Sequence, residues 1–143
     1  MAQIFITALL FISFLNASAE GVPSPEGLWK NEDATFEILE KNGTLVGSVI
    51  SINEPKASAE QIETDIHNPD ASKRNRPLIG LLFMTGFVKK TDTRWENGTI
   101  YDPKTGNTYR CNLEMEGADR IKVRGYIGIA AIGRTAIWTR VSK

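Results

Sequence analysis

The sequence predicts an all-β fold, an eight-stranded antiparallel up-and-down barrel of the size that can hold one small ligand. Along most of the chain, apolar residues recur with a period of two, which is typical of strands that bury one face. Short turn sequences separate these runs, and short connections make consecutive strands antiparallel neighbours. A two-sheet sandwich is the alternative, but it usually needs long crossing connections, and this chain has one long connection.

Residues Met1–Ala19 predict a signal peptide, because they contain no Asp, Glu, Lys or Arg and are mostly apolar. The stretch ends in Ala17-Ser18-Ala19, the small-x-small pattern that signal peptidase accepts. Its apolar run of about a dozen residues is too short to cross a membrane, which takes roughly 20. A buried N-terminal helix is the alternative. We expect cleavage after Ala19, a single domain over 20–143, and a mature protein that is periplasmic or secreted.

The strands follow from alternation and turn chemistry. The clearest run places Tyr109, Cys111, Leu113 and Met115 on one face and polar residues on the other. Asn42-Gly43 favours the type I′ turn of a tight hairpin. In chain order we expect strands at Leu28–Lys30, Thr35–Lys41, Thr44–Ile52, Ile79–Val88, Arg94–Tyr101, Asn107–Met115, Arg120–Ile127 and Arg134–Val141.

Two segments depart from this pattern. Residues 53–78 form one long, mostly polar connection that contains three prolines, and a loop of this length in a compact domain is usually functional or disordered. The strand Ile79–Val88 is apolar on both faces, although a barrel strand has only one inner face. Either the long connection covers its outer face or a second subunit does, so a homodimer through 79–88 is one expectation.

Composition excludes several classes of function. The formal charge is 17 − 17 = 0, whereas a nucleic-acid-binding protein needs a basic excess to meet phosphates. One Cys rules out an intramolecular disulfide and a cysteine-cluster metal site, and one His rules out a multi-histidine site. We therefore expect no cofactor, no metal, no nucleic acid and no membrane span. We expect Cys111 to be buried as a small apolar side chain.

The long connection also holds the residues with catalytic potential. His67 is the single side chain whose unperturbed pKa suits acid–base work near neutrality. Asp65 and Asp70 stand where they can orient it, and a serine can then act as a nucleophile in the manner of a triad. The alternative is an exposed histidine beside an Asn-Pro turn.

Two further polar groups are candidates for recognising the polar head of a ligand. Lys73, Arg74 and Arg76 can clamp an anion at a pocket rim, or they lie in a solvated loop with local aspartates as partners. Arg124 and Tyr126 share the more polar face of their strand, and they line a barrel mouth if this face turns inward. If it turns outward, they cover the outside of the barrel.

Gly27-Leu28-Trp29 opens the first strand, and Arg134 and Arg140 flank Trp138 in the last. This arrangement resembles the lipocalin and wider calycin group, in which the tryptophan closes one barrel end and packs under a basic side chain from near the C-terminus. A closer match extends over almost the whole mature chain, because GLW, NPD, RPLIGL, W-x-x-G-x-IYDP, G-x-x-Y, VRGYIG and GR-x-x-x-W follow one another in this order. In these motifs the sequence is similar to the bacterial secreted family catalogued as domain of unknown function 2147. The resemblance implies a small exported protein with a lipocalin-like barrel, and it carries over no catalytic residue.

The predicted function is non-covalent binding of a small apolar or amphipathic molecule, without catalysis. Eight strands stand near the limit between a hollow and a filled barrel, so the interior can also be filled by its own side chains. A cell-envelope interaction module or dimer without a ligand is the alternative, and an envelope hydrolase using His67 is the third hypothesis. The candidate residues of the barrel lining or rim are Trp29, Phe36, Ile38, Phe83, Trp95, Tyr109, Arg124, Tyr126, Arg134 and Trp138, and those of the loop are His67, Asp70, Arg74 and Arg76.

Overall fold

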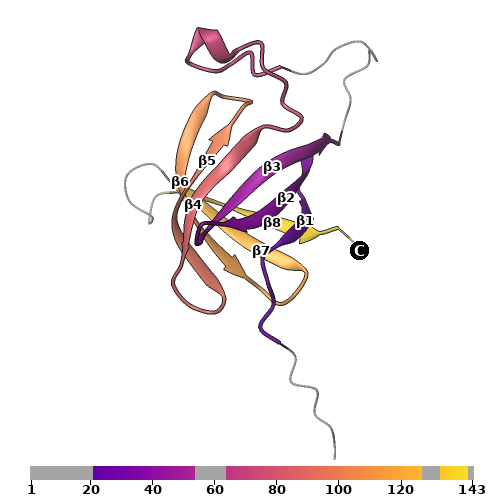
Figure 1. Ribbon diagram of the computed structural model, residues 1–143, viewed down its shortest axis with the longest axis vertical. Helices are drawn as coiled ribbons and strands as arrows, with labels where there is room; N and C mark the ends of the chain where they lie inside the picture. The colour runs from indigo at the N-terminus through magenta and orange to yellow at the C-terminus, as the bar shows by residue number, and fades with distance from the viewer. Residues whose placement is uncertain (1–20, 54–63, 127–132, 142–143) are drawn as a thin grey trace, which may run out of the picture.

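The computed structural model describes residues 21–53, 64–126 and 133–141, within which eight antiparallel strands form a closed barrel (Figure 1). Each strand pairs with the next along the chain, and β1 meets β8 through the pairs Trp29–Arg140 and Lys30–Thr139. The predicted fold class is confirmed, whereas the expected signal peptide lies outside the described residues. The strands are β1 (Gly27–Lys30), β2 (Ala34–Lys41), β3 (Thr44–Ile52), β4 (Leu82–Lys89), β5 (Arg94–Asp102), β6 (Asn107–Met115), β7 (Arg120–Tyr126) and β8 (Gly133–Arg140).

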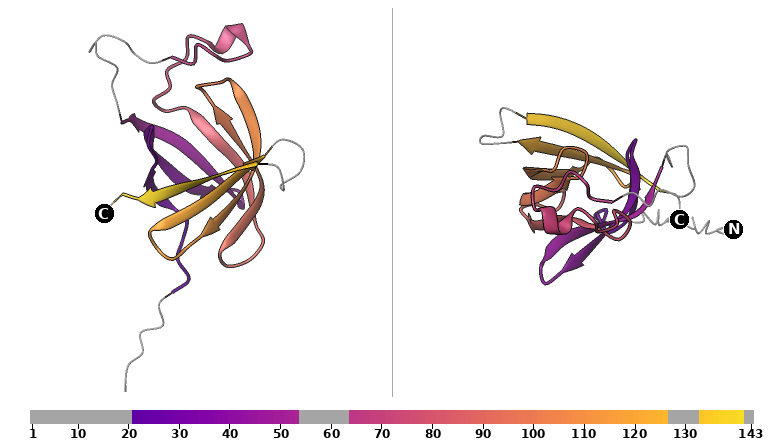
Figure 2. Two further views of the ribbon diagram at one scale, coloured as in Figure 1. Left: turned by 180° about the vertical axis from the view of Figure 1, so that it is seen from behind. Right: turned by 90° about the horizontal axis from the view of Figure 1, so that it is seen from above.

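The connections divide the barrel into two ends. The base carries the turns after β2, β4 and β6, and the upper end carries the turns after β1 and β5 together with the segment 64–81 (Figure 2). At the base, Asn42 and Gly43 have φ values of 52° and 80°, as a type I′ turn requires, so the predicted tight hairpin is confirmed. The described part of the chain contains one short 3-10 helix, η1 (Ala71–Lys73), and none of its helices has the length and apolarity needed to span a membrane.

β4 begins at Leu82, later than the expected start at Ile79. Gly80 has a φ of 86°, and the Leu81 amide donates to the Leu78 carbonyl, so residues 78–81 form a turn. The Gly80 amide donates to the carbonyl of Val49, which keeps this turn against β3. The prediction was wrong here because apolar alternation does not reveal a glycine with positive φ.

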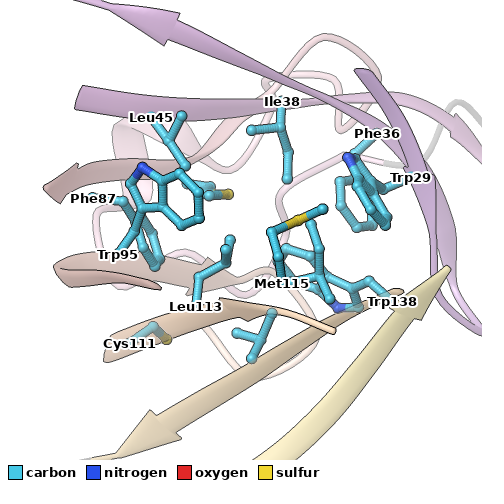
Figure 3. Close-up of a cluster of buried hydrophobic side chains, with 13 residues drawn as sticks. Trp29, Phe36, Ile38, Leu45, Phe87, Trp95, Cys111, Leu113, Met115 and Trp138 are labelled. Carbon is cyan, nitrogen blue, oxygen red and sulfur yellow. The ribbon is translucent and has the colours of Figure 1, made fainter. Parts of the chain in front are cut away.

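The hydrophobic core lies inside the barrel (Figure 3). Phe36 makes edge-to-face contacts with Trp138 and Phe83, at 4.5 and 5.3 Å between ring centres. Gly98 admits the Phe87 ring, because a Cβ at this position would lie 2.1 Å from it. The buried members of the core include Cys111, as predicted, and are Trp29, Phe36, Ile38, Leu45, Met84, Phe87, Trp95, Cys111, Leu113, Met115, Ile121, Val123 and Trp138.

The seam between β1 and β8 is paired only near the base, because β1 has four residues and β8 has eight. All residues of β8 from Gly133 to Ile137 are exposed, whereas Trp138, beside the paired part, is buried. In Figure 2, the beginning of β8 lies apart from β1–β3, and the strand approaches β1 only at its end. Within the described residues, the upper half of β8 therefore has β7 as a neighbour on one side and no strand on the other.

Candidate functional site

Five of the predicted lining residues fill the barrel instead of surrounding a space. Trp29, Phe36, Ile38, Trp95 and Trp138 are all buried members of the core. Their side chains, from β1, β2, β5 and β8, point towards the barrel axis, as Figure 3 shows. In the described part of the chain, the half of the interior nearer the base is thus occupied by the protein's own side chains. A close-packed core of this kind leaves no room for a ligand.

The base is closed by Trp29 beneath Arg140. The guanidinium carbon of Arg140 lies 4.3 Å from the centre of the Trp29 ring, which is a cation–π contact. This is the arrangement that the lipocalin resemblance implies, and the basic partner is Arg140, because Arg134 lies exposed at the other end of β8. The guanidinium nitrogens of Arg140 also donate, at 2.7–2.8 Å, to the backbone carbonyls of Ser24, Glu26 and Ala118.

The inner face is covered less completely in the upper half of the barrel. Phe83, Ile100 and Tyr109 pack against the core but remain partly exposed. Ala136 of β8 pairs with Val123, which is part of the core, so Ala136 lies on the inner face, and yet it is exposed. Apolar surface is therefore accessible from solvent at this end.

Gly125 widens this accessible surface. It pairs with Cys111 of β6 and with Arg134 of β8, and a Cβ at Gly125 would lie 3.7 Å from the Tyr109 Cβ. Because glycine has no side chain, the inner face of β7 at Gly125 stays uncovered between the side chains of Tyr109 and Arg134. We call the resulting surface the upper inner face, which consists of Phe83, Ile100, Tyr109, Gly125, Arg134 and Ala136. It is apolar apart from one phenol and one guanidinium group.

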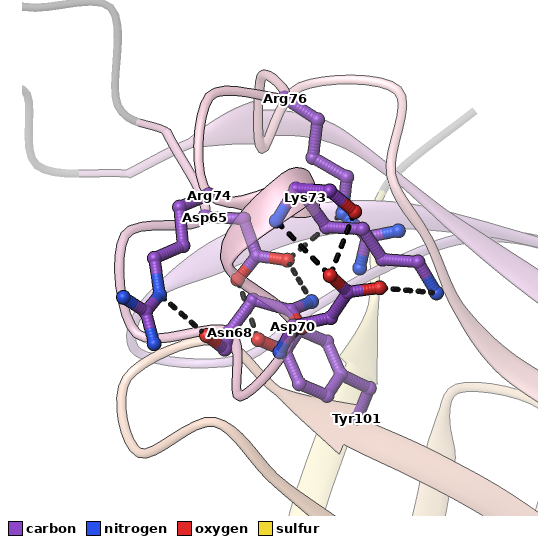
Figure 4. Close-up of polar contacts among 8 residues, drawn as sticks. Asp65, Asn68, Asp70, Lys73, Arg74, Arg76 and Tyr101 are labelled. Carbon is purple, nitrogen blue, oxygen red and sulfur yellow. Dashed lines mark hydrogen bonds and ion pairs between the residues drawn. The ribbon is translucent and has the colours of Figure 1, made fainter.

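The segment above the barrel is held by a buried carboxylate that the sequence did not single out as a centre (Figure 4). Asp65 is fully buried, and its oxygens accept hydrogen bonds from Tyr101 at 2.5 Å and from Asn68 and Arg76 at 2.8 Å. The Arg76 guanidinium also lies over the Tyr101 ring, 5.7 Å from its centre. This cluster fastens the segment 64–81 to β5.

The surroundings of Asp65 favour its charged form. Burial by itself raises the pKa of Asp65, but hydrogen bonds from Asn68, Tyr101 and Arg76, with the charge of Arg76, bring the pKa below the ordinary value of 3.8. Burial and the adjacent carboxylate raise the pKa of Tyr101 to about 12, so the phenol keeps its proton. Because its polar groups satisfy one another, the cluster has the chemistry of an anchor and not of a reactive site.

His67 is exposed, and the two aspartates expected to orient it are engaged elsewhere. The Asp65 carboxylate binds the three donors described above, and the Asp70 carboxylate accepts from the amide and the hydroxyl of Ser72. The His67 carbonyl packs on Gly106, where a Cβ would lie 2.1 Å from the oxygen. This geometry gives no support to the hydrolase hypothesis.

The basic cluster of the loop makes local contacts. Arg76 pairs with Asp65 at 2.8 Å, and Lys73 lies 4.0 Å from Asp70. The Arg74 Nε donates to the carbonyl of Asn68 at 2.8 Å. These contacts correspond to the interpretation of a solvated loop whose aspartates are local partners. Because the Nε atoms of Arg74 and Arg76 are used in these contacts, an anion clamp would depend on their Nη atoms.

Arg124 and Tyr126 lie on the outer face of β7, because they alternate with the buried Val123. The Arg124 Nη1 donates to the hydroxyl of Thr135 at 3.0 Å on the outer face of β8. The expectation that they line the barrel mouth is therefore corrected. Conversely, sequence reasoning missed Gly125 and Ala136, because their contribution is the absence of a bulky side chain.

A shallow cleft of about 220 Å³ lies at the base, between residues 22–26 and the turns after β2 and β4, and it is shared by acidic, basic and apolar side chains. Among residues 21–53, 64–126 and 133–141, no three His, Cys, Asp or Glu side chains come together in a way that could hold a metal ion. The upper inner face is therefore the best candidate for ligand binding.

Comparison with known proteins agrees with the barrel topology. A solved structure, "Protein HP1028 from the human pathogen Helicobacter pylori belongs to the lipocalin family", matches with a TM-score of 0.74 and 21% identity over 84% of each chain, which shows a shared fold. No curated protein matches the sequence. The model of a family described as "Uncharacterized protein conserved in bacteria (DUF2147)" matches residues 27–140, from the first residue of β1 to the last of β8. The chain therefore belongs to the DUF2147 family, and its barrel is lipocalin-like.

Proposed function

We propose that this protein is an exported binding protein that holds a small apolar or amphipathic molecule against its upper inner face and performs no chemistry on it. The observation that carries the proposal is the contrast between the two halves of the barrel. Inner side chains near the base are buried, whereas Phe83, Ile100 and Tyr109 stay partly exposed beside an exposed Ala136. Accessible apolar surface on a concave support is the usual feature of a small-molecule site.

The filled base limits the strength of binding. Apolar burial contributes roughly 25 cal/mol per Å², so a molecule that covers roughly 200 Å² of this face gains about 5 kcal/mol before its loss of freedom is subtracted. We therefore expect submillimolar or weaker affinity for a rigid apolar probe. A flexible amphipathic molecule can add a contact between its head group and Arg134 at the exposed end of the surface.

A pair of matched variants tests the site. Ala136→Phe places a ring on the upper inner face, and Ile137→Phe places the same ring on the outer face of the same strand. The probe is 1-anilinonaphthalene-8-sulfonate, followed by its fluorescence. We expect Ala136→Phe to weaken binding about tenfold or more and Ile137→Phe to leave it unchanged. Equal binding by both variants, with circular dichroism showing intact folds, would overturn the proposed site.

Native mass spectrometry of protein purified from its own host tests whether a natural ligand exists. We expect an added mass that organic extraction removes. A bare polypeptide mass in every preparation would contradict a carrier role. Export is tested separately by the N-terminal sequence of protein from the periplasmic fraction and the medium, where we expect Glu20 as the first residue.

A second candidate function is an interaction module, or a homodimer, that uses the outer face of residues 79–88. The observation that favours it is the exposure of apolar side chains along this segment: Ile79 is 61% exposed, Leu82 51% and Val88 44%. Leu82→Asp would then dissociate the assembly in light scattering. A monomeric wild-type protein would remove the homodimer form of this candidate.

A further inference from the structure

Among the described residues, β8 presents a backbone edge with no paired strand in the upper half of the barrel. Its pairing with β7 runs from Gly133 to Thr139, but its pairing with β1 is limited to Thr139 and Arg140. Within the described residues, the edge from Gly133 to Ile137 has no strand beside it. All five residues are exposed, and Figure 2 shows this part of β8 at the periphery, away from β1–β3.

The hydrogen bonds at the end of β8 show which backbone groups face this edge. The Arg140 amide donates towards β7, to the carbonyl of Asp119, and the Val141 amide donates towards β1, to the carbonyl of Leu28. Backbone groups of a strand point alternately to its two sides. The amide and carbonyl groups of Gly133, Thr135 and Ile137 therefore point outward, whereas those of Arg134 and Ala136 bond to β7.

This edge carries few of the features that normally prevent strands from pairing. Natural edge strands are protected by charged side chains, proline, a bulge or a covering segment. From Gly133 to Ile137 the edge contains no proline and no lysine, Arg134 is its single charged residue, and Thr135 and Ile137 have high strand propensity. The β7–β8 register also runs without a shift across these residues, so the strand is regular.

We propose that this edge binds a second copy of the chain, with β8 pairing antiparallel to β8 of the partner about a two-fold axis at Thr135. In this register Thr135 faces its own copy, and Gly133 faces Ile137 of the other chain. All three outward amides and all three outward carbonyls of each chain are then satisfied. Cross-strand Thr–Thr pairs are favourable in antiparallel sheets.

The charge pattern fits this register. The one charged residue of the edge, Arg134, lies opposite Ala136 of the other chain, so no like charges stand directly opposite each other. A two-fold contact of this kind is closed, because each copy uses the same edge once. An unrelated extended peptide could also form hydrogen bonds with these backbone groups, but it would not place Thr135 opposite Thr135 and Gly133 opposite Ile137. The proposal does not depend on ligand binding, which uses the inner face.

Proline and valine at the axis position provide the first test. Thr135→Pro removes the outward amide and spares the amides that bond to β7, and proline is tolerated at such edge positions. Thr135→Val keeps the amide and removes only the hydroxyl that accepts from Arg124. In light scattering we expect the mature wild type and Thr135→Val to dimerise, and Thr135→Pro to dimerise about tenfold more weakly or not at all. A monomeric wild type, or a dimer unaffected by proline, would overturn the proposal.

Cysteine cross-linking provides a second test that holds even if the proline variant misfolds. Directly opposed residues of a hydrogen-bonded antiparallel pair have Cα atoms about 5.5 Å apart, which is within the range for a disulfide. We expect Thr135→Cys to form a covalent dimer under mild oxidation, and Ile137→Cys, which faces glycine, to react much more slowly. The native Cys111 is buried, so the wild-type protein under the same oxidation gives the background level of cross-linking. Cross-linking through Leu82→Cys instead would assign the interface to the outer face of β4 and overturn the β8 register.

Discussion

Arg140 links parts of the chain that are distant in sequence, because one guanidinium group stacks on Trp29 and donates to three backbone carbonyls. Arg140→Met keeps a long side chain but removes the charge and all the donors. We expect a loss of about 2–4 kcal/mol in the free energy of unfolding, measured with urea and tryptophan fluorescence. Arg134→Met is the matched control, since this arginine is exposed, and it should change stability by less than about 0.5 kcal/mol. Equal losses in both variants would refute the assignment.

For single residues, the sequence predicts the type of contact but not which of two similar residues makes it. That a tryptophan and a terminal arginine close the base could be predicted, but the choice between Arg134 and Arg140 depends on carbonyls supplied by residues 24–26 and by the turn after β6. Asp65 likewise differs little from Asp70 in its local sequence. It becomes buried because Tyr101, 36 positions away, supplies a hydroxyl. Tertiary contacts decide which arginine stacks on Trp29 and which aspartate is buried, so the local sequence pattern cannot predict either choice.

At the level of elements, the strands could be predicted because alternation and turn residues are local signals. Asn42-Gly43 specifies its hairpin through the conformations that these two residues adopt readily. The start of β4 could not be predicted, because Gly80 turns the chain within an apolar run. The place of the segment 64–81 was equally hidden, since it depends on a contact between the His67 carbonyl and Gly106 of the turn after β5.

Gly106 therefore makes a sharp test of how this segment is held. Gly106→Ala forces a methyl group to within 2.1 Å of the His67 carbonyl oxygen, at a φ of 75°. Gly117→Ala is the control, because its φ is 77° but a Cβ there meets nothing within 4 Å. The control should cost about 1–2 kcal/mol for its left-handed conformation, and Gly106→Ala should cost more. Trypsin should also cleave Gly106→Ala faster after the exposed Lys73 and Arg74. Equal stability and equal cleavage would show that the contact does not hold the segment.

For the whole molecule, the sequence predicted a closed barrel but not how full it is. Alternation indicates which side chains face inward, and it does not indicate whether those from opposite walls meet. Phe36 and Trp138 make an edge-to-face contact inside the barrel, and Gly98 admits the Phe87 ring, so the base half is filled. Within the described residues, the shortness of β1 leaves the upper half of β8 without a strand on its β1 side, so the same barrel has a solid base and an accessible upper face.

The buried cluster on the upper segment makes the stability of the whole barrel depend on pH in two windows. The pKa of Asp65 is lower in the folded state than the ordinary 3.8, so its contribution is present above about pH 4 and is lost as pH falls through the folded pKa. The pKa of Tyr101 rises from 10.0 to about 12 on folding, so its contribution is present below pH 10 and is lost as pH rises towards 12. Between these windows we expect neither group to change stability.

Tyr101→Phe separates the two windows. It removes the phenol, so the alkaline loss due to this residue should vanish, and it deprives Asp65 of one donor, so the folded-state pKa of Asp65 moves closer to 3.8 and the acid loss due to Asp65 should become smaller. At neutral pH we expect a loss of about 1–3 kcal/mol, because a buried carboxylate is left with fewer hydrogen bonds. Tyr109→Phe is the control, since its hydroxyl has only a 3.4 Å contact with Asn107, and it should leave both windows in place. Urea midpoints measured from acid to alkaline pH decide the matter: an unchanged acid limb in Tyr101→Phe would mean that the Tyr101 hydrogen bond does not lower the pKa of Asp65.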